Sequence, residues 1–257
     1  EVNILGKSRQ PVYVLWFVGD YASYHTRMQP ATRALAKILN LLGVKFGILG
    51  PDELSDGDSQ RLAGERGLFE MMAQKNGQIF KRFKFNEIIT TDPHAYNALK
   101  NEYPALGIGY PVKHYTQFLH EKLEQIKPLL KHEIKARIAY HDACYLGRVN
   151  KIFDEPRELI QAIPGVELVE MSHQRLNSLC CGGGGGGMWL DGFQWEKAHT
   201  RLSEWRVREA LAANADILAV ACPYEPPRFE DATKTIQNAS QLKVRDIAEL
   251  LAEAMEL

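Results

Sequence analysis

Cys180-Cys181-Gly182-Gly183-Gly184-Gly185-Gly186-Gly187-Met188-Trp189 is the stretch on which the interpretation of the whole chain depends. Six consecutive glycines carry a large entropic cost on folding, so packing alone does not explain them. A glycine backbone can pass close to a bulky group and point bare N–H groups at it. Adjacent cysteines have poor geometry for a disulfide with each other, whereas neighbouring thiolates can hold different metals of one cluster. The stretch therefore predicts a loop around a thiolate-bound metal group.

The other two cysteines, Cys144 and Cys222, lie far from this pair in the sequence, one on each side of it. Predicted strands at 136–140 and 216–221, the second of them an apolar run typical of a buried strand, end shortly before these cysteines, and a third predicted strand at 166–171 precedes the cysteine pair. Open α/β sheets bind ligands at the carboxyl ends of their strands. We therefore expect three loops to deliver all four thiols to one edge of a sheet.

The chemistry of four such thiols favours an iron–sulfur cluster. Thiolates select soft metals, and structural zinc sites use short paired spacings that this chain lacks. The backbone N–H groups of Gly182 and Gly183 would then approach the inorganic sulfides and tune the reduction potential. A zinc site and four buried free thiols acting as small hydrophobes remain the alternatives.

Composition places few limits on the function. The chain has 257 residues, 45% hydrophobic and 25% charged, with a net charge of −1, which is typical of a globular protein and gives no argument for a nucleic-acid partner. Four cysteines within one region favour metal binding in a reducing compartment over a secreted disulfide framework. No signal peptide or transmembrane run is visible, so we expect a cytoplasmic protein. Because the chain opens at Glu1 rather than Met, association with a membrane through partners or an upstream segment stays open.

The order of predicted elements repeats along the chain. Buried strands and helices alternate in both halves, which indicates two tandem, duplicated open α/β units with mostly parallel sheets. We predict an irregular N-terminal arm over 1–11, a first domain over 12–120 and a second over 121–257, with a hinge near 110–135. The expected strands of the first half are 12–18, 44–49 and 87–91, and the expected helices of the chain are 31–42, 59–76, 95–102, 156–162, 195–213 and 244–255.

The first half carries acids where the second half carries cysteines. Asp20, Asp56 and Asp92 follow its three predicted strands at similar spacings, with Asp58 and His94 close by. Oxygen ligands suit Mg²⁺ or Ca²⁺, so a hard-metal site is one interpretation. The other is that these acids are helix caps and solvated loop residues, since a carboxylate is favourable at a helix N-terminus.

Three segments carry a resemblance to a known family: Tyr140-His141-Asp142-Ala143-Cys144-Tyr145-Leu146-Gly147-Arg148, Cys180-Cys181-Gly182-Gly183 and Ala221-Cys222-Pro223-Tyr224. They resemble the CCG (cysteine-rich) domain, which occurs twice in the B and D subunits of heterodisulfide reductases and in related iron–sulfur oxidoreductases. The segment from Thr91 to Pro104 resembles the same domain with both of its cysteines replaced. The chain looks most like the branch that serves electron-transfer flavoprotein:quinone oxidoreductases.

The resemblance implies a ligand set and also shows two departures from it. Cys144, Cys180, Cys181 and Cys222 are the implied metal ligands, and His141 is a neighbour of the cluster, as we also expect of His173. Glu225 stands where the family has a fifth cysteine, and the first half has no thiol. The cluster could thus be a non-cubane or cubane [4Fe-4S] form or a linear [3Fe-4S] form. Glu225 is an oxygen ligand, a near neighbour or a salt-bridged surface residue.

The resemblance further implies an electron-transfer subunit of a larger oxidoreductase complex. Its partners would be a flavoprotein or a ferredoxin-like iron–sulfur protein on one side, and a quinone or other acceptor, with a membrane quinone-reducing subunit, on the other. One alternative is catalytic reduction of a disulfide or heterodisulfide, against which the missing cysteines argue. The other alternative is a structural docking role within a redox complex.

Overall fold

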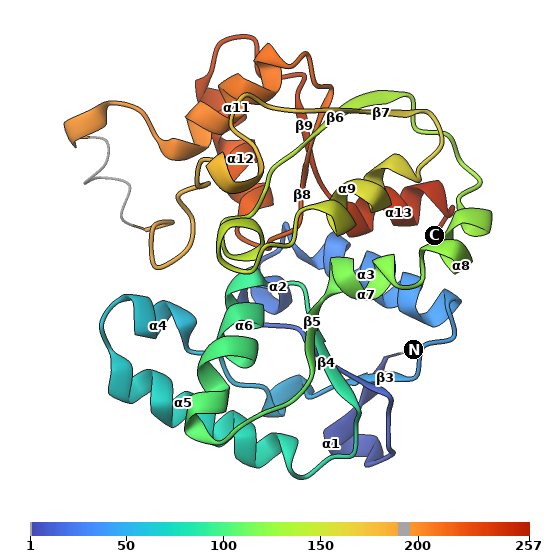
Figure 1. The fold of residues 1–257 in the computed structure, drawn as a ribbon, viewed down its shortest axis with the longest axis vertical. Helices are drawn as coiled ribbons and strands as arrows, with labels where there is room; N and C mark the ends of the chain where they lie inside the picture. Colours follow the sequence, from blue (N-terminus) through green and yellow to red (C-terminus); the bar gives the residue numbers. More distant parts are fainter. Residues whose placement is uncertain (1, 190–195) are drawn as a thin grey trace.

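The computed structural model describes residues 2–189 and 196–257 and contains two parallel sheets with helices packed around them (Figure 1). The elements of the first half are β1 (Asn3–Ile4), α1 (Leu5–Ser8), β2 (Val14–Phe17), α2 (Asp20–Tyr24), α3 (Gln29–Leu41), β3 (Phe46–Ile48), α4 (Asp58–Leu62), α5 (Arg66–Phe80), β4 (Glu87–Thr90), α6 (Pro93–Asn97), β5 (Val112–His114), α7 (Tyr115–His120) and α8 (Leu123–Ile126). Those of the second half are β6 (Ala136–Tyr140), α9 (Asp154–Gln161), β7 (Val166–Val169), α11 (Leu202–Ala212), β8 (Ile217–Val220), α12 (Glu225–Thr235), β9 (Lys243–Asp246) and α13 (Ile247–Ala254).

The two sheets have the same topology. The first has the order β1-β3-β2-β4-β5 and the second β7-β6-β8-β9, so the second repeats the first without the short edge strand β1. Every strand pair in both sheets is parallel. The central strands β2, β4 and β8 are buried along their whole length, as their apolar runs predict. The predicted duplicated α/β architecture is confirmed.

Each half contains a fourth strand that the sequence patterns did not reveal. We expected Val112–His114 to lie in a hinge and Val244 to begin the last helix, but these residues form β5 and β9. Both strands lie at a sheet edge and carry charged residues, so neither shows a continuous apolar run. Each is followed by a helix with a capping box, His114 with Gln117 and Asp246 with Glu249.

Several predicted boundaries are wrong. The irregular arm expected over 1–11 is not found over residues 2–11, because β1 pairs with β3 and Leu5 on α1 is fully buried. The helix expected over 59–76 is two helices, α4 and α5, separated at Gly64, where φ is +92°. The helix expected over 195–213 corresponds to α11, and its first predicted residue lies outside the described residues.

The two halves share a hydrophobic core. Helices α3 and α13 pack against each other between the sheets (Figure 1), and one buried cluster joins Val14 and Trp16 of the first sheet to Ile138 and Ile217 of the second. Tyr115 Oη donates a hydrogen bond of 2.8 Å across this core to Asp246 Oδ1. The proposed domain boundary at residue 120 therefore separates two sheets that are packed into one body.

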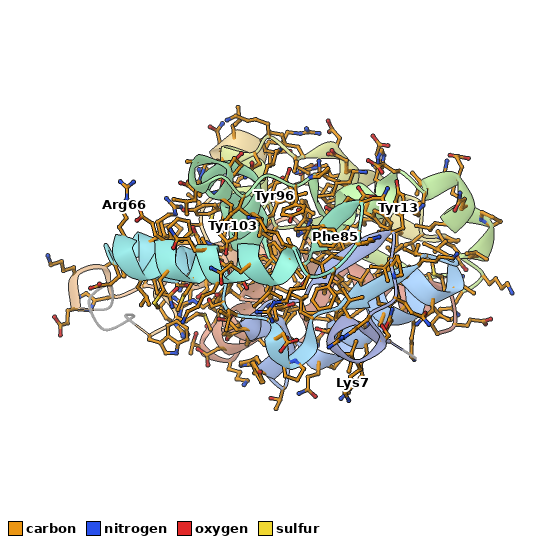
Figure 2. The ribbon with its side chains drawn as sticks, turned by 90° about the horizontal axis from the view of Figure 1, so that it is seen from below. Lys7, Tyr13, Arg66, Phe85, Tyr96 and Tyr103 are labelled. Carbon is orange, nitrogen blue, oxygen red and sulfur yellow. The ribbon has the colours of Figure 1, made fainter. Side chains whose placement is uncertain are left out.

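A second apolar cluster lies on the far side of the first sheet, under α5. Figure 2 shows Tyr103 in the interior, where it is fully buried, and Arg66 of α5 projecting outward, with its side chain 85% exposed. No helix among the residues that the structure describes is long and apolar enough to cross a bilayer.

Candidate metal centre

Three loops at the carboxyl edge of the second sheet carry the four cysteines. Cys144 follows β6 and begins a π-helical turn over Tyr145–Val149, and Cys222 follows β8 just before α12. Cys180 and Cys181 lie on the long segment after β7, past a short helical turn at Arg175–Asn177. The predicted convergence of these loops is thus found in the fold.

Two of the four sulfur atoms are in direct contact. Cys180 Sγ lies 4.0 Å from Cys144 Sγ, and none of the four cysteines forms a disulfide. The N–H groups of Gly182 and Gly183 donate to the sulfurs of Cys180 and Cys181, each at 3.3 Å. The hydrogen bonds that Cys180 shares with Cys144 and Cys181, with help from the amide of Gly182, lower the pKa of the Cys180 thiol, whereas the contact with Cys180 and burial raise the pKa of Cys144 and Cys181, and burial raises that of Cys222. Among the four cysteines, Cys180 is therefore the one whose surroundings favour the thiolate, which is the metal-binding form.

The glycine run is packed where side chains would not fit. A Cβ on Gly184 would lie 2.2 Å from His94 Nε2, and one on Gly187 would lie 2.3 Å from the carbonyl oxygen of Gly182. Gly182, Gly185 and Gly186 also adopt positive φ angles, at which L side chains are strained. The loop thus needs glycine both for its turns and for its close approach to the first half of the chain.

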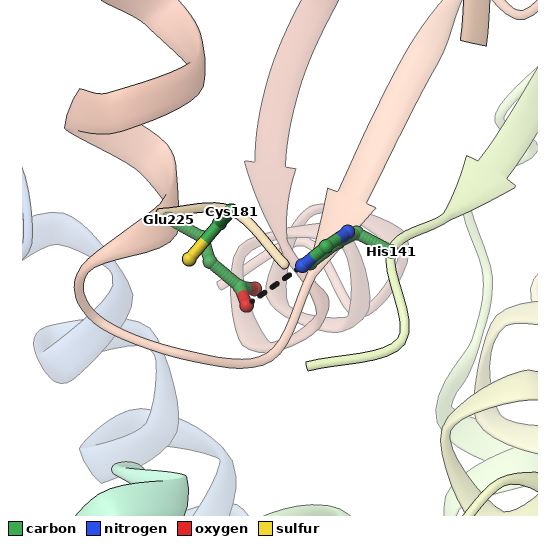
Figure 3. A group of neighbouring side chains, drawn as sticks. All are labelled: His141, Cys181 and Glu225. Atoms are coloured by element: carbon green, nitrogen blue, oxygen red, sulfur yellow. Dashed lines mark ion pairs between the residues drawn. The ribbon is translucent and has the colours of Figure 1, made fainter. Parts of the chain in front are cut away.

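His141, Cys181 and Glu225 form a compact buried group (Figure 3). One potential ligand atom of each lies within 4.8 Å of the others. Glu225 is 1% exposed, so the interpretation of Glu225 as a salt-bridged surface residue is wrong. Its burial, between the loops and α12, follows from its position as the first residue of that helix. Burial raises the pKa of the Glu225 carboxyl well above its ordinary value.

Two polar atoms of this group lack hydrogen-bond partners within the described part of the chain. Glu225 Oε1 lies 3.2 Å from His141 Nε2, but the angle does not meet that of a hydrogen bond, and neither His141 Nε2 nor Glu225 Oε2 has another partner. Leaving buried polar atoms unpaired costs about 1–3 kcal/mol each. Such atoms beside four thiols are the expected features of a site built for a bound group.

Arg206 is a member of this site that sequence patterns did not reveal. It lies on α11, is fully buried, and its Nε donates to His141 Nδ1 at 3.0 Å. Burial, together with the charge of Arg206, lowers the pKa of His141 well below its ordinary value. His141 is therefore neutral, and because its Nδ1 accepts, its proton lies on Nε2, which faces Glu225. No motif surrounds Arg206 in the sequence, so its place in the site can be recognised only from the three-dimensional structure.

His173 does not join the site. Its side chain is 53% exposed and pairs with Glu209 on α11. Its backbone carbonyl instead accepts a hydrogen bond from Arg206 Nη1. The expectation of a ring beside the cysteines is therefore wrong for His173, because the segment after β7 turns its side chain toward solvent.

Three of the four acids singled out in the first half are buried. Asp56, Asp58 and Asp92 are at most 5% exposed, which contradicts the interpretation of them as solvated loop residues, and Asp20 is exposed. Asp92 caps α6, as the capping interpretation predicts, by accepting from the N–H of His94. Asp58 Oδ2 lies 2.8 Å from His94 Nδ1. Asp56 also accepts a backbone hydrogen bond, from the N–H of Asp58, and Asp58 pairs with Arg61 as well as with His94.

This acidic cluster adjoins the cysteine loops of the second half. The ring of His94 lies 4.3 Å from that of Tyr145 and 5.6 Å from that of Tyr224, centroid to centroid. Tyr145 follows Cys144, and Tyr224 lies two residues after Cys222. The two strand edges that the duplication makes equivalent therefore face each other across the interface between the halves.

The burial of Asp56 predicts a pH dependence of stability. Desolvation and the charge of Asp92 raise the pKa of Asp56 from 3.8 to about 8. The folded state thus holds this proton more tightly than the unfolded state, and this part of the stability is lost as the pH rises from about 4 to about 8. The Asp56→Asn variant lacks this proton equilibrium and should not lose this part of its stability. We therefore expect the change in unfolding free energy that the substitution causes to be more favourable at pH 8 than at pH 5, by on the order of 1 kcal/mol or more.

Urea unfolding at the two pH values measures this effect. Exposed Asp52 on the same half provides the control, since Asp52→Asn should leave the difference between pH 5 and pH 8 unchanged. An equal gain from Asp56→Asn at both pH values would show that Asp56 is ionised throughout this range.

Comparison with known proteins identifies the family. The cysteine-rich domain (CCG) family matches the chain twice, at residues 14–100 and 138–224. The chain therefore belongs to this family and carries two copies of its domain, as the motifs predicted.

Curated relatives carry redox names. The chain is 42% identical over 243 residues to the probable iron-sulfur-binding oxidoreductase FadF of Bacillus subtilis, covering 95% of this chain and 34% of that protein. It is 34% identical to the EtfAB:quinone oxidoreductase of Syntrophomonas wolfei, covering 99% and 36% of the two chains. It is 32% identical to a subunit of the dihydromethanophenazine:CoB--CoM heterodisulfide reductase of Methanosarcina barkeri, covering 95% and 59%. The chain thus spans about a third of the first two relatives.

Proposed function

We propose that this chain is the electron-transfer part of an iron–sulfur oxidoreductase and holds one cluster through Cys144, Cys180, Cys181 and Cys222. The observation that carries the proposal is the convergence of four unpaired cysteines, from three loops, at one sheet edge with backbone N–H groups aimed at two of the sulfurs. A bound iron–sulfur cluster supplies one-electron transfer, at a potential tuned by such hydrogen bonds and by burial.

The surroundings of the cysteines fit this group. Cys181 and Cys222 are at most 5% exposed, whereas Cys144 and Cys180 are partly exposed, so the site has a dry side and a side near solvent. Electron exchange with another protein needs such an accessible edge. Gly182 and Gly183 line the site with their amides, and His141, held by Arg206, lies on its buried side.

Glu225 belongs to the same site in this proposal and supplies it with an oxygen ligand. The carboxylate is buried beside Cys181, and one of its oxygens has no partner among the described residues. We expect Glu225→Gln, which keeps the shape and removes the charge, to change the EPR spectrum of the bound cluster and to lower the iron content per chain. Glu87→Gln, at a buried carboxylate of β4 paired with Lys113, is the control. An unchanged spectrum and iron content in Glu225→Gln would assign Glu225 a role as a neighbour only.

The partners of this chain are proposed from the names of its relatives. Relatives named for an electron-transfer flavoprotein:quinone oxidoreductase and a heterodisulfide reductase favour a flavoprotein or ferredoxin-like donor and a quinone or other acceptor. Association with a membrane would come through such partners or through further segments of a longer protein.

Reduction of a disulfide at this site is the second candidate, supported by the heterodisulfide reductase relative. The replacement of the fifth family cysteine by Glu225 and the absence of thiols in the first half argue against it. A potentiometric titration combined with a disulfide turnover assay tests the choice. The proposal expects a reversible one-electron transition without disulfide turnover; turnover would establish the catalytic function, and a cluster that is not reduced or oxidised reversibly would leave only a structural docking role.

A further inference from the structure

An open cleft lies between the two halves, next to the cysteine loops. It has a volume of about 490 Å³ and is lined mainly by apolar surface, with Tyr21, Tyr24 and His25 on the first half and Tyr224 and Trp189 on the second. Small-molecule and cofactor sites are mostly apolar clefts of about 300–1,000 Å³ that lie between domains. The cleft is thus of the size and position typical of a ligand site.

One wall of the cleft is a stack of aromatic rings. The rings of Tyr21 and His25 are stacked at 4.8 Å with an interplanar angle of 12°, and Tyr21 lies 4.5 Å from Tyr224. Tyr224 lies two residues after Cys222. A ring added to this stack would therefore lie close to the cysteine site.

Two further aromatic side chains at the cleft are unusually exposed. Tyr24 is 82% exposed and Trp189 is 70% exposed, although both are large apolar residues whose burial would stabilise the fold. Trp189 belongs to the turn that ends the glycine run, and Tyr24 ends α2. Packing among the described residues leaves both side chains largely exposed, whereas stacking on a flat ligand would cover both.

The polar groups of the cleft lie on its first-half side. Gln60 Oε1 is buried and has no hydrogen-bond partner within the described residues, and Ser55 and Ser59 add hydroxyl groups. An unpaired buried acceptor is costly and would be satisfied by an N–H or O–H at the edge of a ligand. Aromatic walls with hydrogen-bonding groups at one edge suit a flat ring that has polar substituents.

We propose that this cleft binds the planar conjugated ring of a redox carrier, a flavin or a quinone, stacked against Tyr21, Tyr24 and Trp189. The inference deepens the proposed electron-transfer function and rests on it, because it places the ring of the donor or acceptor beside the Cys222 loop. Gln60 would accept a hydrogen bond from the ring edge.

Binding of two probes tests the proposal on anaerobically purified protein whose iron and sulfide have been counted. FMN is followed by quenching of its fluorescence, and menadione by equilibrium dialysis. We expect saturable binding of at least one probe, weakened about 2- to 12-fold in Tyr24→Ala or Trp189→Ala because each variant loses one aromatic contact. Trp205→Ala is the matched control, since Trp205 is 52% exposed on α11 and does not line the cleft.

The outcomes distinguish a flavin from a quinone, and they distinguish a failure of the cleft proposal from a failure of the proposed electron-transfer function. Binding of FMN identifies a flavin site and binding of menadione a quinone site, provided that Tyr24→Ala and Trp189→Ala weaken it and Trp205→Ala does not. Absence of saturable binding, or binding that these two variants leave unchanged, overturns the cleft proposal even when the cluster is present. Absence of iron and sulfide would instead overturn the proposed function, and this is measured independently of probe binding.

Discussion

Cys181→Ser is expected to lose most of the bound iron and to unfold at a lower temperature than the wild-type protein. Cys181 is 5% exposed, its sulfur accepts from the Gly183 amide, and it lies beside His141 and Glu225. Serine is a much poorer ligand for iron than thiolate. Because the free energy of metal binding contributes to folding, loss of the cluster also lowers stability.

Iron per chain and the midpoint of thermal unfolding measure both effects. A loss of 1 kcal/mol lowers the midpoint by about 2–4 °C in a chain of this size, so a shift of several degrees is expected. The metal-free proteins serve as the control, since removal of iron from both should abolish most of the difference between them. A variant that retains the full iron content would show that Cys181 is not a ligand.

Gly187→Ala is expected to disrupt the glycine loop and with it the metal centre. The new Cβ would lie 2.3 Å from the carbonyl oxygen of Gly182, a backbone atom that cannot rotate away as a side chain can. The strain would displace Gly182 and Gly183, whose amides donate to the cysteine sulfurs. Overpacking of this kind costs about 1–3 kcal/mol, and the displaced donors should also shift the reduction potential of any cluster that remains.

Gly67→Ala on α5 is the matched control. A Cβ there meets nothing within 4 Å, so the substitution should preserve the iron content and slightly stabilise the helix. Chemical denaturation and potentiometry on both variants provide the test. If Gly187→Ala matches the wild-type protein in stability and potential, the loop is more pliable than its close packing implies.

The parts of the fold that sequence predicted best are those with buried, continuous apolar runs. Strands β2, β4 and β8 were found because both of their faces are covered, and the repeated order of elements indicated the duplication. Strands β5 and β9 were missed because edge strands keep charged residues such as Lys113 and Arg245. Their pattern does not differ from that of a loop or a helix start.

The site was predictable only where adjacent or similarly placed residues supplied a motif. The cysteines and glycines did so, and the structure brings the cysteine loops together. Arg206 could not be found in this way, because its importance comes from burial and from contact with His141, which lies far away in the sequence. The interpretation of Glu225 as a surface residue was wrong because the two prolines after it, Pro226 and Pro227, are typical of exposed segments. In the structure they belong to the first turn of α12, the end at which Glu225 is buried.

Iron and acid-labile sulfide per chain, measured on anaerobically purified protein together with its EPR spectrum, test the central claim most directly. The account predicts three or four irons with matching sulfide, and a spectrum that distinguishes a four-iron cluster from a linear three-iron one. Zinc without sulfide would contradict it, because the four cysteines would then form a structural site and the chain would not carry electrons.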